Sequence, residues 1–284
     1  MKIGFIGLGI MGSGMAGNLA SHGFELVVFN RTAGKAQLLV EKGSRLAASP
    51  AELGEQVDVV FTMLPKPEAV EAVATGKDGF LIHLKPGSIW VDCSTVNPSF
   101  SRRMGAEAAK YNVRFLDAPV FGSKTPAAKG ELNFFIGGRS EDLEACRPYF
   151  EAMGKKIVHA GGQGMGASMK MCINLMAGSA MLAFTEAAHL GESLGIPRQA
   201  LFDTLIGSAV AAPLIGAKRG KFESGTFDPE FSLQWMRKDL QLITQTGYEQ
   251  NVPLPVTNAA KEVFAQAEKA GLGEEDYSAV YKFL

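Results

Sequence analysis

The sequence predicts an α/β protein in which a doubly wound parallel sheet comes first, a long helix follows, and an all-α domain ends the chain. Two patterns along the 284 residues lead to this prediction. As far as residue 160, short apolar runs alternate with segments of 3.6-residue periodicity, as is typical of βαβ units in a parallel sheet. After the glycine-rich stretch 161–164 only helical patterns remain. We therefore predict domain boundaries at 1–162, 163–195 and 196–284.

The predicted strands are short, apolar and bounded by polar residues or glycine. They lie at 2–6, 26–29, 57–63, 88–92, 114–118, 134–137 and 157–159. Periodic segments predict helices at 11–22, 100–111, 165–194, 197–207, 231–250 and 256–270. Gly195 is placed to end the long helix 165–194, and Pro197 is suited to begin the next one.

Composition excludes several classes of protein. Hydrophobic residues make up 46% of the chain, enough to bury a core, and the net charge of −1 lacks the basic excess of a nucleic-acid or anionic-membrane binder. Three separated cysteines (Cys93, Cys146 and Cys172) and four scattered histidines favour neither a disulfide framework nor a metal site. The uncharged run 171–185 is shorter than the ~20 residues of a membrane span. We predict a soluble cytoplasmic protein without a metal.

The first chemical motif is Gly7-Leu8-Gly9-Ile10-Met11-Gly12, which directly follows a strand and opens a helix. In a Rossmann-type domain this context indicates dinucleotide binding. Gly7 permits the tight turn, Gly9 lets a pyrophosphate approach the backbone, and Gly12 lets helix and strand pack closely. The alternative is a glycine-rich turn that packs and binds nothing.

The end of the second strand indicates which dinucleotide is bound. Where an NAD-binding domain usually has an acidic residue, the chain reads Asn30-Arg31-Thr32. The Arg31 guanidinium can pair with the 2′-phosphate of NADP(H), which a carboxylate would repel. Asn30 and Thr32 add neutral hydrogen-bonding groups. The alternative is a solvated loop arginine.

Two further strand ends should border the cofactor, because ligands of doubly wound sheets bind at the carboxyl ends of the strands. They read Met63-Leu64-Pro65 and Asp92-Cys93-Ser94-Thr95. Thr95 is either a neighbour of the nicotinamide ribose or the N-cap of the helix that contains Pro98.

The third motif lies on the long helix. Gly166, Lys170 and Asn174 are spaced by four residues and share a face, and Lys170 is the only charge between Lys156 and Glu186. An ammonium in such apolar surroundings needs a partner or a task, unless it snorkels to solvent. Further on, the stripe of Phe231, Trp235 and Met236 is typical of a core, and Lys238-Asp239 alone is typical of a solvated charge pair.

Together these residues resemble the β-hydroxyacid dehydrogenase family, which includes 3-hydroxyisobutyrate dehydrogenases and glyoxylate/succinic-semialdehyde reductases. The similarity rests on the segment from Phe5 to Gly12 with Met15–Leu19, on Asp92–Thr95, on Gly166–Asn174, and on Lys238-Asp239-Leu240. It covers nearly the whole chain in the family's order.

The resemblance implies a role for each motif. Lys170 would be the catalytic residue, which gives a proton to the carbonyl oxygen during reduction. Ser94 and Asn174 would contact the substrate, Phe231 and Lys238 the cofactor. Family members commonly form dimers or tetramers, so a homo-oligomer is expected.

The substrate loop departs from the family's pattern. It reads Ala118-Pro119-Val120-Phe121-Gly122-Ser123, with Phe121 where the family has a small hydroxyl residue. Phe121 removes a hydrogen bond to the substrate carboxylate, although Gly122 and Ser123 could still bind an anion. The continuation Gly-Ser-Lys-x-Pro is most similar to the glyoxylate/succinic-semialdehyde reductase branch.

The leading hypothesis is therefore NADPH-dependent reduction of a small aldehyde or keto acid, of the succinic semialdehyde or glyoxylate class. The alternatives are a 3-hydroxyisobutyrate-type dehydrogenase acting oxidatively, and a relative that reduces a non-acid carbonyl or an imine. From a different class comes a non-catalytic NADP-binding module, which would be expected to lack Lys170.

Overall fold

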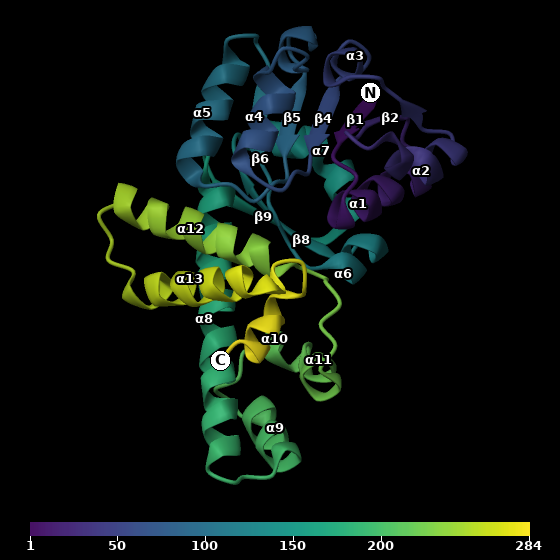
Figure 1. Cartoon of the computed structure of the whole chain (residues 1–284). Helices are drawn as coiled ribbons and strands as arrows, with labels where there is room; N and C mark the ends of the chain where they lie inside the picture. The colour runs from purple at the N-terminus through teal and green to yellow at the C-terminus, as the bar shows by residue number, and fades with distance from the viewer. The chain divides into compact units, whose positions relative to one another are not determined.

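The computed structural model describes all 284 residues, and Figure 1 shows their helices and strands. Contacts between Cα atoms divide the chain into two compact units, Met1–Lys170 and Met171–Leu284. The predicted boundaries at 1–162, 163–195 and 196–284 treat the long helix as a separate segment. The division into two units does not test this, so the three boundaries remain a prediction.

The first unit contains a nine-stranded sheet whose larger part is parallel. Its parallel strands run in the order β3 (Arg45–Leu46), β2 (Leu26–Phe29), β1 (Ile3–Ile6), β4 (Val59–Thr62), β5 (Ile89–Asp92) and β6 (Arg114–Asp117). The strand order reverses between β1 and β4, which is the place where doubly wound sheets bind ligands. The predicted doubly wound sheet is confirmed.

Three strands extend the sheet beyond β6. β8 (Leu132–Gly137) runs antiparallel to β6. β7 (Val120–Phe121) runs antiparallel to β8, and β9 (Gly154–Gly161) runs parallel to β8. All seven predicted strands are confirmed, within three residues at each end. The two strands that the sequence did not predict, β3 and β7, have two residues each, too few to produce an apolar run.

Helices cover both faces of this sheet. They are α1 (Ile10–Ser21), α2 (Gln37–Glu41), α3 (Pro50–Gly54), α4 (Pro67–Thr75), α5 (Pro98–Ala109), α6 (Lys124–Lys129) and α7 (Ser140–Met153), with short 3₁₀ turns at Ala33–Ala36 and Leu81–His83. Successive strand residues enter different cores, because side chains alternate across a strand. On β4, Phe61 belongs to one apolar cluster and Val60 to the other. This double burial explains why the strands are apolar throughout.

The second unit is helical, as predicted. Its elements are α8 (Met165–Ser193, which begins in the first unit), α9 (Arg198–Gly207), α10 (Pro213–Gly216), α11 (Arg219–Ser224), α12 (Leu233–Glu249), α13 (Pro255–Ala267), and short turns at Glu268–Leu272 and Tyr277–Lys282. Helices α12 and α13 lie side by side (Figure 1), and the core contains Phe184, Phe202, Phe222 and Leu240. The single β-bridge of this unit joins Ser232 and Asp276.

Helix α8 ends where the sequence predicts. Gly195 adopts a φ of +84°, and the N–H of Ile196 donates to the carbonyl of Gly191 at 3.1 Å. A left-handed residue that follows a helix is favoured when it is glycine, because no Cβ is present to clash. The prediction for Gly195 is confirmed.

Helix α8 is also more extensive than its uncharged run. The uncharged run covers residues 171–185, whereas the helix has 29 residues and includes an 18-residue window of mean hydropathy 1.3. By length and composition α8 could cross a membrane. However, 44% of that window is buried within the protein, and the core helices of soluble proteins have the same length and composition.

Candidate active site

The loop between β1 and α1 has the steric properties of a phosphate-binding turn. Gly7 has a φ of +100°. A Cβ at Gly7 would collide with the carbonyl oxygen of Met63, and one at Gly12 with the carbonyl oxygen of Gly7. Nothing lies within 4 Å of a Cβ built at Gly9, so this glycine faces open space. Gly7 and Gly12 are therefore needed for the turn and for close packing, and the open space at Gly9 fits the approach of a ligand, which remains a prediction.

The N-terminus of α1 begins at Gly9 and Ile10 with no side-chain cap and no acidic residue in its first turn. Its first N–H groups lack intrahelical partners and carry the positive end of the helix dipole. Together with the open space at Gly9, they provide a site that fits the pyrophosphate of a dinucleotide.

Of the three residues after β2, Asn30 makes hydrogen bonds within the protein, whereas Arg31 and Thr32 are exposed. The Oδ1 atom of Asn30 accepts the N–H of Leu8 at 2.9 Å, and its Nδ2 donates to the carbonyl of Thr32 at 3.0 Å. Asn30 therefore holds the glycine loop against β2. Arg31 and Thr32 are exposed, and Arg31 makes no ion pair in the structure. The Arg31 guanidinium is available to an incoming anion.

The ends of β4 and β5 are joined by buried hydrogen bonds. Trp90 Nε1 donates to Thr62 Oγ1 at 2.9 Å, and Thr62 donates to Asp92 Oδ1 at 2.8 Å. Asp92 also accepts the N–H of Ser94 at 3.1 Å, while the Ser94 hydroxyl accepts the N–H of Leu64 at 2.9 Å. Ser94 is buried, and its hydrogen bonds join the loop after β4 to the loop after β5. Its contact with the substrate remains a prediction.

Thr95 follows this network and is half-buried. The N-cap of α5 is Asn97, with Pro98 as the first helical residue. The capping alternative for Thr95 is therefore wrong, since the helix begins three residues further on. Its placement beside a nicotinamide ribose remains a prediction, as do the contacts of Met63, Leu64 and Pro65 with the cofactor.

Asp92 makes the stability of the protein depend on pH. Burial raises its pKa to about 6, and the hydrogen bonds from Ser94 and Thr62 only partly oppose this. Between pH ~4 and ~6 the unfolded chain releases this proton while the folded protein keeps it. The free energy of unfolding should therefore fall by up to ~3 kcal/mol as the pH rises through this window, and Asp92→Asn should reduce the slope.

Urea titrations at several pH values measure this slope for both proteins. Burial also raises the pKa of Asp117 to about 6, so a part of the slope should remain in Asp92→Asn. Equal slopes in the two proteins would contradict the assignment to Asp92.

Asp117 attaches the start of α8 to the sheet. It ends β6, and its two carboxylate oxygens accept the N–H groups of Gly164 at 2.7 Å and Ala167 at 2.8 Å. A Cβ at Gly166 would collide with the carbonyl of Phe135, so the first turn of α8 lies directly on the strands. Asp117 was not among the predicted site residues, although it ends a buried strand in the same way as Asp92.

Lys170 lies one turn further along α8 and is only 8% exposed. The alternative in which it snorkels to solvent is therefore wrong. Its Nζ lies 5.7 Å from the ring centroid of Phe121, which ends β7 and is 38% exposed. The structure thus brings together the predicted catalytic lysine and the residue that departs from the family's substrate loop.

Gly122 and Ser123 follow Phe121 in the predicted substrate loop. Gly122 adopts a φ of +135°, and a Cβ there would lie 2.8 Å from Leu132 Cδ2. Ser123 is the N-cap residue of α6, and its hydroxyl caps no N–H group of that helix. An anion contact by either residue remains a prediction.

In the second unit, Asn174 is buried four residues after Lys170 on α8 and donates from Nδ2 to Asp239 Oδ2 at 2.6 Å. The Lys238 Nζ lies 2.7 Å from Asp239 Oδ1. Asp239 is buried, so the interpretation of Lys238-Asp239 as a solvated pair is wrong. The missed signal is helical spacing, because Asp239 shares a face with the core residues Met236 and Ile243.

Phe231 precedes α12 and is partly buried, with its ring 5.7 Å from that of Tyr277. Together with Asn174 and Lys238, it makes up the predicted site residues of the second unit. Their contacts with substrate or cofactor are predictions that concern this unit alone.

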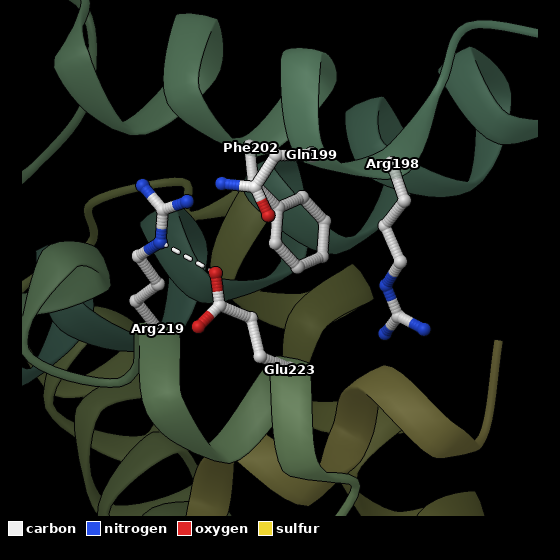
Figure 2. Close-up of a pocket in the computed structure, with 5 residues that line it drawn as sticks. All are labelled: Arg198, Gln199, Phe202, Arg219 and Glu223. Carbon is white, nitrogen blue, oxygen red and sulfur yellow. Dashed lines mark hydrogen bonds and ion pairs between the residues drawn. The ribbon is translucent and has the colours of Figure 1, made fainter.

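The second unit also has an open hollow of about 730 Å³. Figure 2 shows its lining: Arg198, Gln199, Phe202, Arg219 and Glu223. Arg219 is paired with Glu223 at 2.7 Å and with Asp203 at 2.6 Å, so its charge is already compensated. The hollow contains none of the predicted site residues. No group of three or more His, Cys, Asp or Glu side chains in the protein is placed to hold a metal ion.

The glycine turn, the strand order and the lysine on α8 define an NAD(P)-dependent oxidoreductase with a Rossmann-type domain and a helical C-terminal domain. Residues 2–162 match the family model of the NAD-binding domain of 6-phosphogluconate dehydrogenase. Residues 164–284 match that of NADP-dependent 3-hydroxyisobutyrate dehydrogenase. The chain belongs to the 3-hydroxyisobutyrate dehydrogenase family of enzymes that act on hydroxy acids.

Relatives cover the chain almost completely. It is 36% identical to glyoxylate/succinic semialdehyde reductase 1 of Arabidopsis thaliana, over 99% of this chain and 97% of the relative. The structure of Mycobacterium tuberculosis 3-hydroxyisobutyrate dehydrogenase with L-serine matches with a TM-score of 0.90 and 31% identity, over 99% of this chain and 98% of that one. Psf3 in complex with NADP+ and 2-OPP matches with a TM-score of 0.89 and 25% identity, over 99% of each chain. The predicted family and enzyme class are confirmed.

Proposed function

We propose that this enzyme reduces a small aldehyde or keto acid of the succinic semialdehyde or glyoxylate class, with NADPH as the reductant. The observation that carries the proposal is the buried Lys170 on α8, which lies near Phe121 of the predicted substrate loop. The residues that follow Phe121 read Gly-Ser-Lys-x-Pro, which is most similar to the glyoxylate/succinic-semialdehyde reductase branch. The similarity to the Arabidopsis reductase supports the same substrate class.

NADP(H), when bound, supplies the hydride that reduces the carbonyl carbon. The glycine turn and the N-terminus of α1 hold its pyrophosphate, and Arg31 pairs with its 2′-phosphate. Lys170 gives a proton from its ammonium group to the carbonyl oxygen and regains one from solvent. In the oxidative direction the Lys170 amine accepts that proton. Asn174, whose amide is held by Asp239, orients the substrate.

Turnover of NADPH with a panel of small carbonyl acids tests this function, with NADH measured in parallel. Reduction of succinic semialdehyde or glyoxylate with NADPH preferred would support the proposal. Oxidation of 3-hydroxyisobutyrate alone would favour the oxidative alternative. Turnover of uncharged carbonyls or imines alone would favour a substrate without a carboxylate.

Arg31→Ala should change the choice of cofactor. A charge-assisted pair with the 2′-phosphate contributes about 1.5–3 kcal/mol, so the KM for NADPH should rise about 10- to 100-fold while that for NADH stays nearly constant. The control is Lys42→Ala, which removes an exposed cation at the end of α2 and should leave both constants unchanged. Equal changes for NADPH and NADH would refute the assignment.

We further propose that the enzyme is a homo-oligomer in a reducing, cytoplasmic compartment. Apolar side chains are exposed at Met176 and Leu190 on α8 and at Leu194 directly after it, which supports a contact with a second copy. All three cysteines are free. Light scattering measures the mass of the protein in solution. A mass of 30.2 kDa, that of one chain, would contradict the proposed homo-oligomer.

A further inference from the structure

The chain places an aromatic ring beside its proposed proton donor. Phe121 is partly exposed at the end of β7, where it pairs with Asn133 of β8, and its ring centroid lies 5.7 Å from Lys170 Nζ. A phenylalanine that remains more than one-third exposed gains little by burial in the core, so its apolar surface is available to a ligand.

Proton transfer fixes how near a substrate comes to this ring. Lys170 must lie about 3 Å from the carbonyl oxygen to protonate it. The groups bonded to the carbonyl carbon are only two bonds from that oxygen. When the carbonyl approaches Nζ from the side of the ring, one of these groups comes within van der Waals reach of the ring, whose centroid lies 5.7 Å from the same Nζ. In that approach the ring contacts the reacting end of the substrate.

The chemistry of the ring decides which group is favoured there. A phenyl ring donates no hydrogen bond, and the negative face of its π-system attracts the ammonium of Lys170 and repels a carboxylate. An aliphatic group in the same place leaves water and packs on the ring. Area burial corresponds to about a fourfold gain in affinity per buried methylene.

We infer that Phe121 is a specificity-determining residue that selects carbonyl compounds with an aliphatic carbon next to the carbonyl, and disfavours those whose carboxylate is bonded directly to the carbonyl carbon. The inference rests on the proposed role of Lys170. Within the proposed substrate class it favours semialdehydes with intervening methylenes, such as succinic semialdehyde, over glyoxylate.

The test is a chain-length series. For the wild type, kcat/KM should rise about fourfold per methylene from glyoxylate to the malonic and succinic semialdehydes. Phe121→Leu keeps an apolar side chain and should keep most of this dependence. Phe121→Ser should flatten the series and raise the ratio of glyoxylate to succinic semialdehyde turnover by about tenfold or more. A wild-type preference for glyoxylate, or an unchanged ratio in Phe121→Ser, would overturn the inference.

A binding series separates this inference from the proposed function. Straight-chain amides from acetamide to valeramide resist reduction, and calorimetry measures their affinity for the enzyme saturated with NADPH. If no carbonyl acid is reduced, the proposed function fails. A chain-length dependence of amide binding that Phe121→Ser abolishes would still support the apolar contact, and equal dependence in both proteins would overturn it.

Discussion

Replacing Lys170 by methionine should lower kcat by about 10²- to 10⁴-fold, the usual contribution of a general acid. Methionine keeps an unbranched side chain of similar length and removes only the ammonium. Because Lys170 lies on α8 and the glycine turn lies between β1 and α1, the affinity for NADPH should change little. Steady-state kinetics and fluorescence titration with NADPH measure the two effects separately.

The matched control is Lys156→Met, which removes an exposed ammonium from β9 and should leave kcat unchanged. Thermal unfolding of Lys170→Met checks that the variant is folded, so that a loss of kcat can be assigned to the missing ammonium. Full turnover by Lys170→Met would refute the catalytic role and reopen the hypothesis of a non-catalytic NADP-binding module.

Replacing Lys218 by methionine should destabilise the second unit by about 3–5 kcal/mol, the cost of leaving a buried charge without its partner. Lys218 Nζ lies 2.9 Å from both Asp276 Oδ2 and Glu230 Oε2, and the Lys218 and Asp276 side chains are 7% and 0% exposed. Asp276 also accepts the hydroxyl of Ser278 at 2.7 Å. Chemical denaturation measures the loss.

The pH dependence of this pair has a definite sign. Burial alone would raise the pKa of Asp276, but the charge of Lys218 and the Ser278 hydroxyl outweigh it and hold the pKa below its usual range. The stabilisation is therefore present above pH ~4 and is lost as the pH falls through the folded-state pKa. In Lys218→Met this acid-labile component should disappear.

Two further variants distinguish the pair from a general effect of substitution. Lys221→Met changes a neighbouring lysine on α11 whose ammonium contacts only the carbonyl of Asp228 at the surface, and it should cost less than ~1 kcal/mol. Adding Asp276→Asn to Lys218→Met should recover part of the loss, because the unpaired charge is removed. A cost for Lys218→Met no larger than that for Lys221→Met would contradict the prediction.

Local and periodic features of the fold could be predicted from the sequence. Strands buried on both faces are apolar throughout, and the roles of Gly7, Gly9 and Gly12 follow from a turn within six residues of chain. In both cases, neighbours in sequence are neighbours in space. Phe121 was recognised in a different way, because it departs from the pattern of the family that the chain resembles.

Contacts between distant segments could not be predicted. Asp117 meets Gly164 across 47 residues, and Asn174 meets Asp239 across 65. Nothing near Asp117 or Asp239 in the sequence indicates these partners. Each was visible only as a polar residue on a buried strand or helix face, and that pattern predicts burial without identifying the contact. The assignment of Asn30 to the cofactor likewise overlooked its hydrogen bond to Leu8, which joins two strand ends.

The buried indole of Trp90 allows the two units to be observed separately. The chain has two tryptophans, Trp90 on β5 in the first unit and Trp235 on α12 in the second. The hydrogen bond from Trp90 to Thr62 and the apolar core around it place this indole in an environment that is lost when the sheet unfolds. Replacing either tryptophan by phenylalanine leaves a single tryptophan, so tryptophan emission during denaturation would follow one unit at a time. The wild-type sequence thus carries an intrinsic reporter for each unit without added dyes.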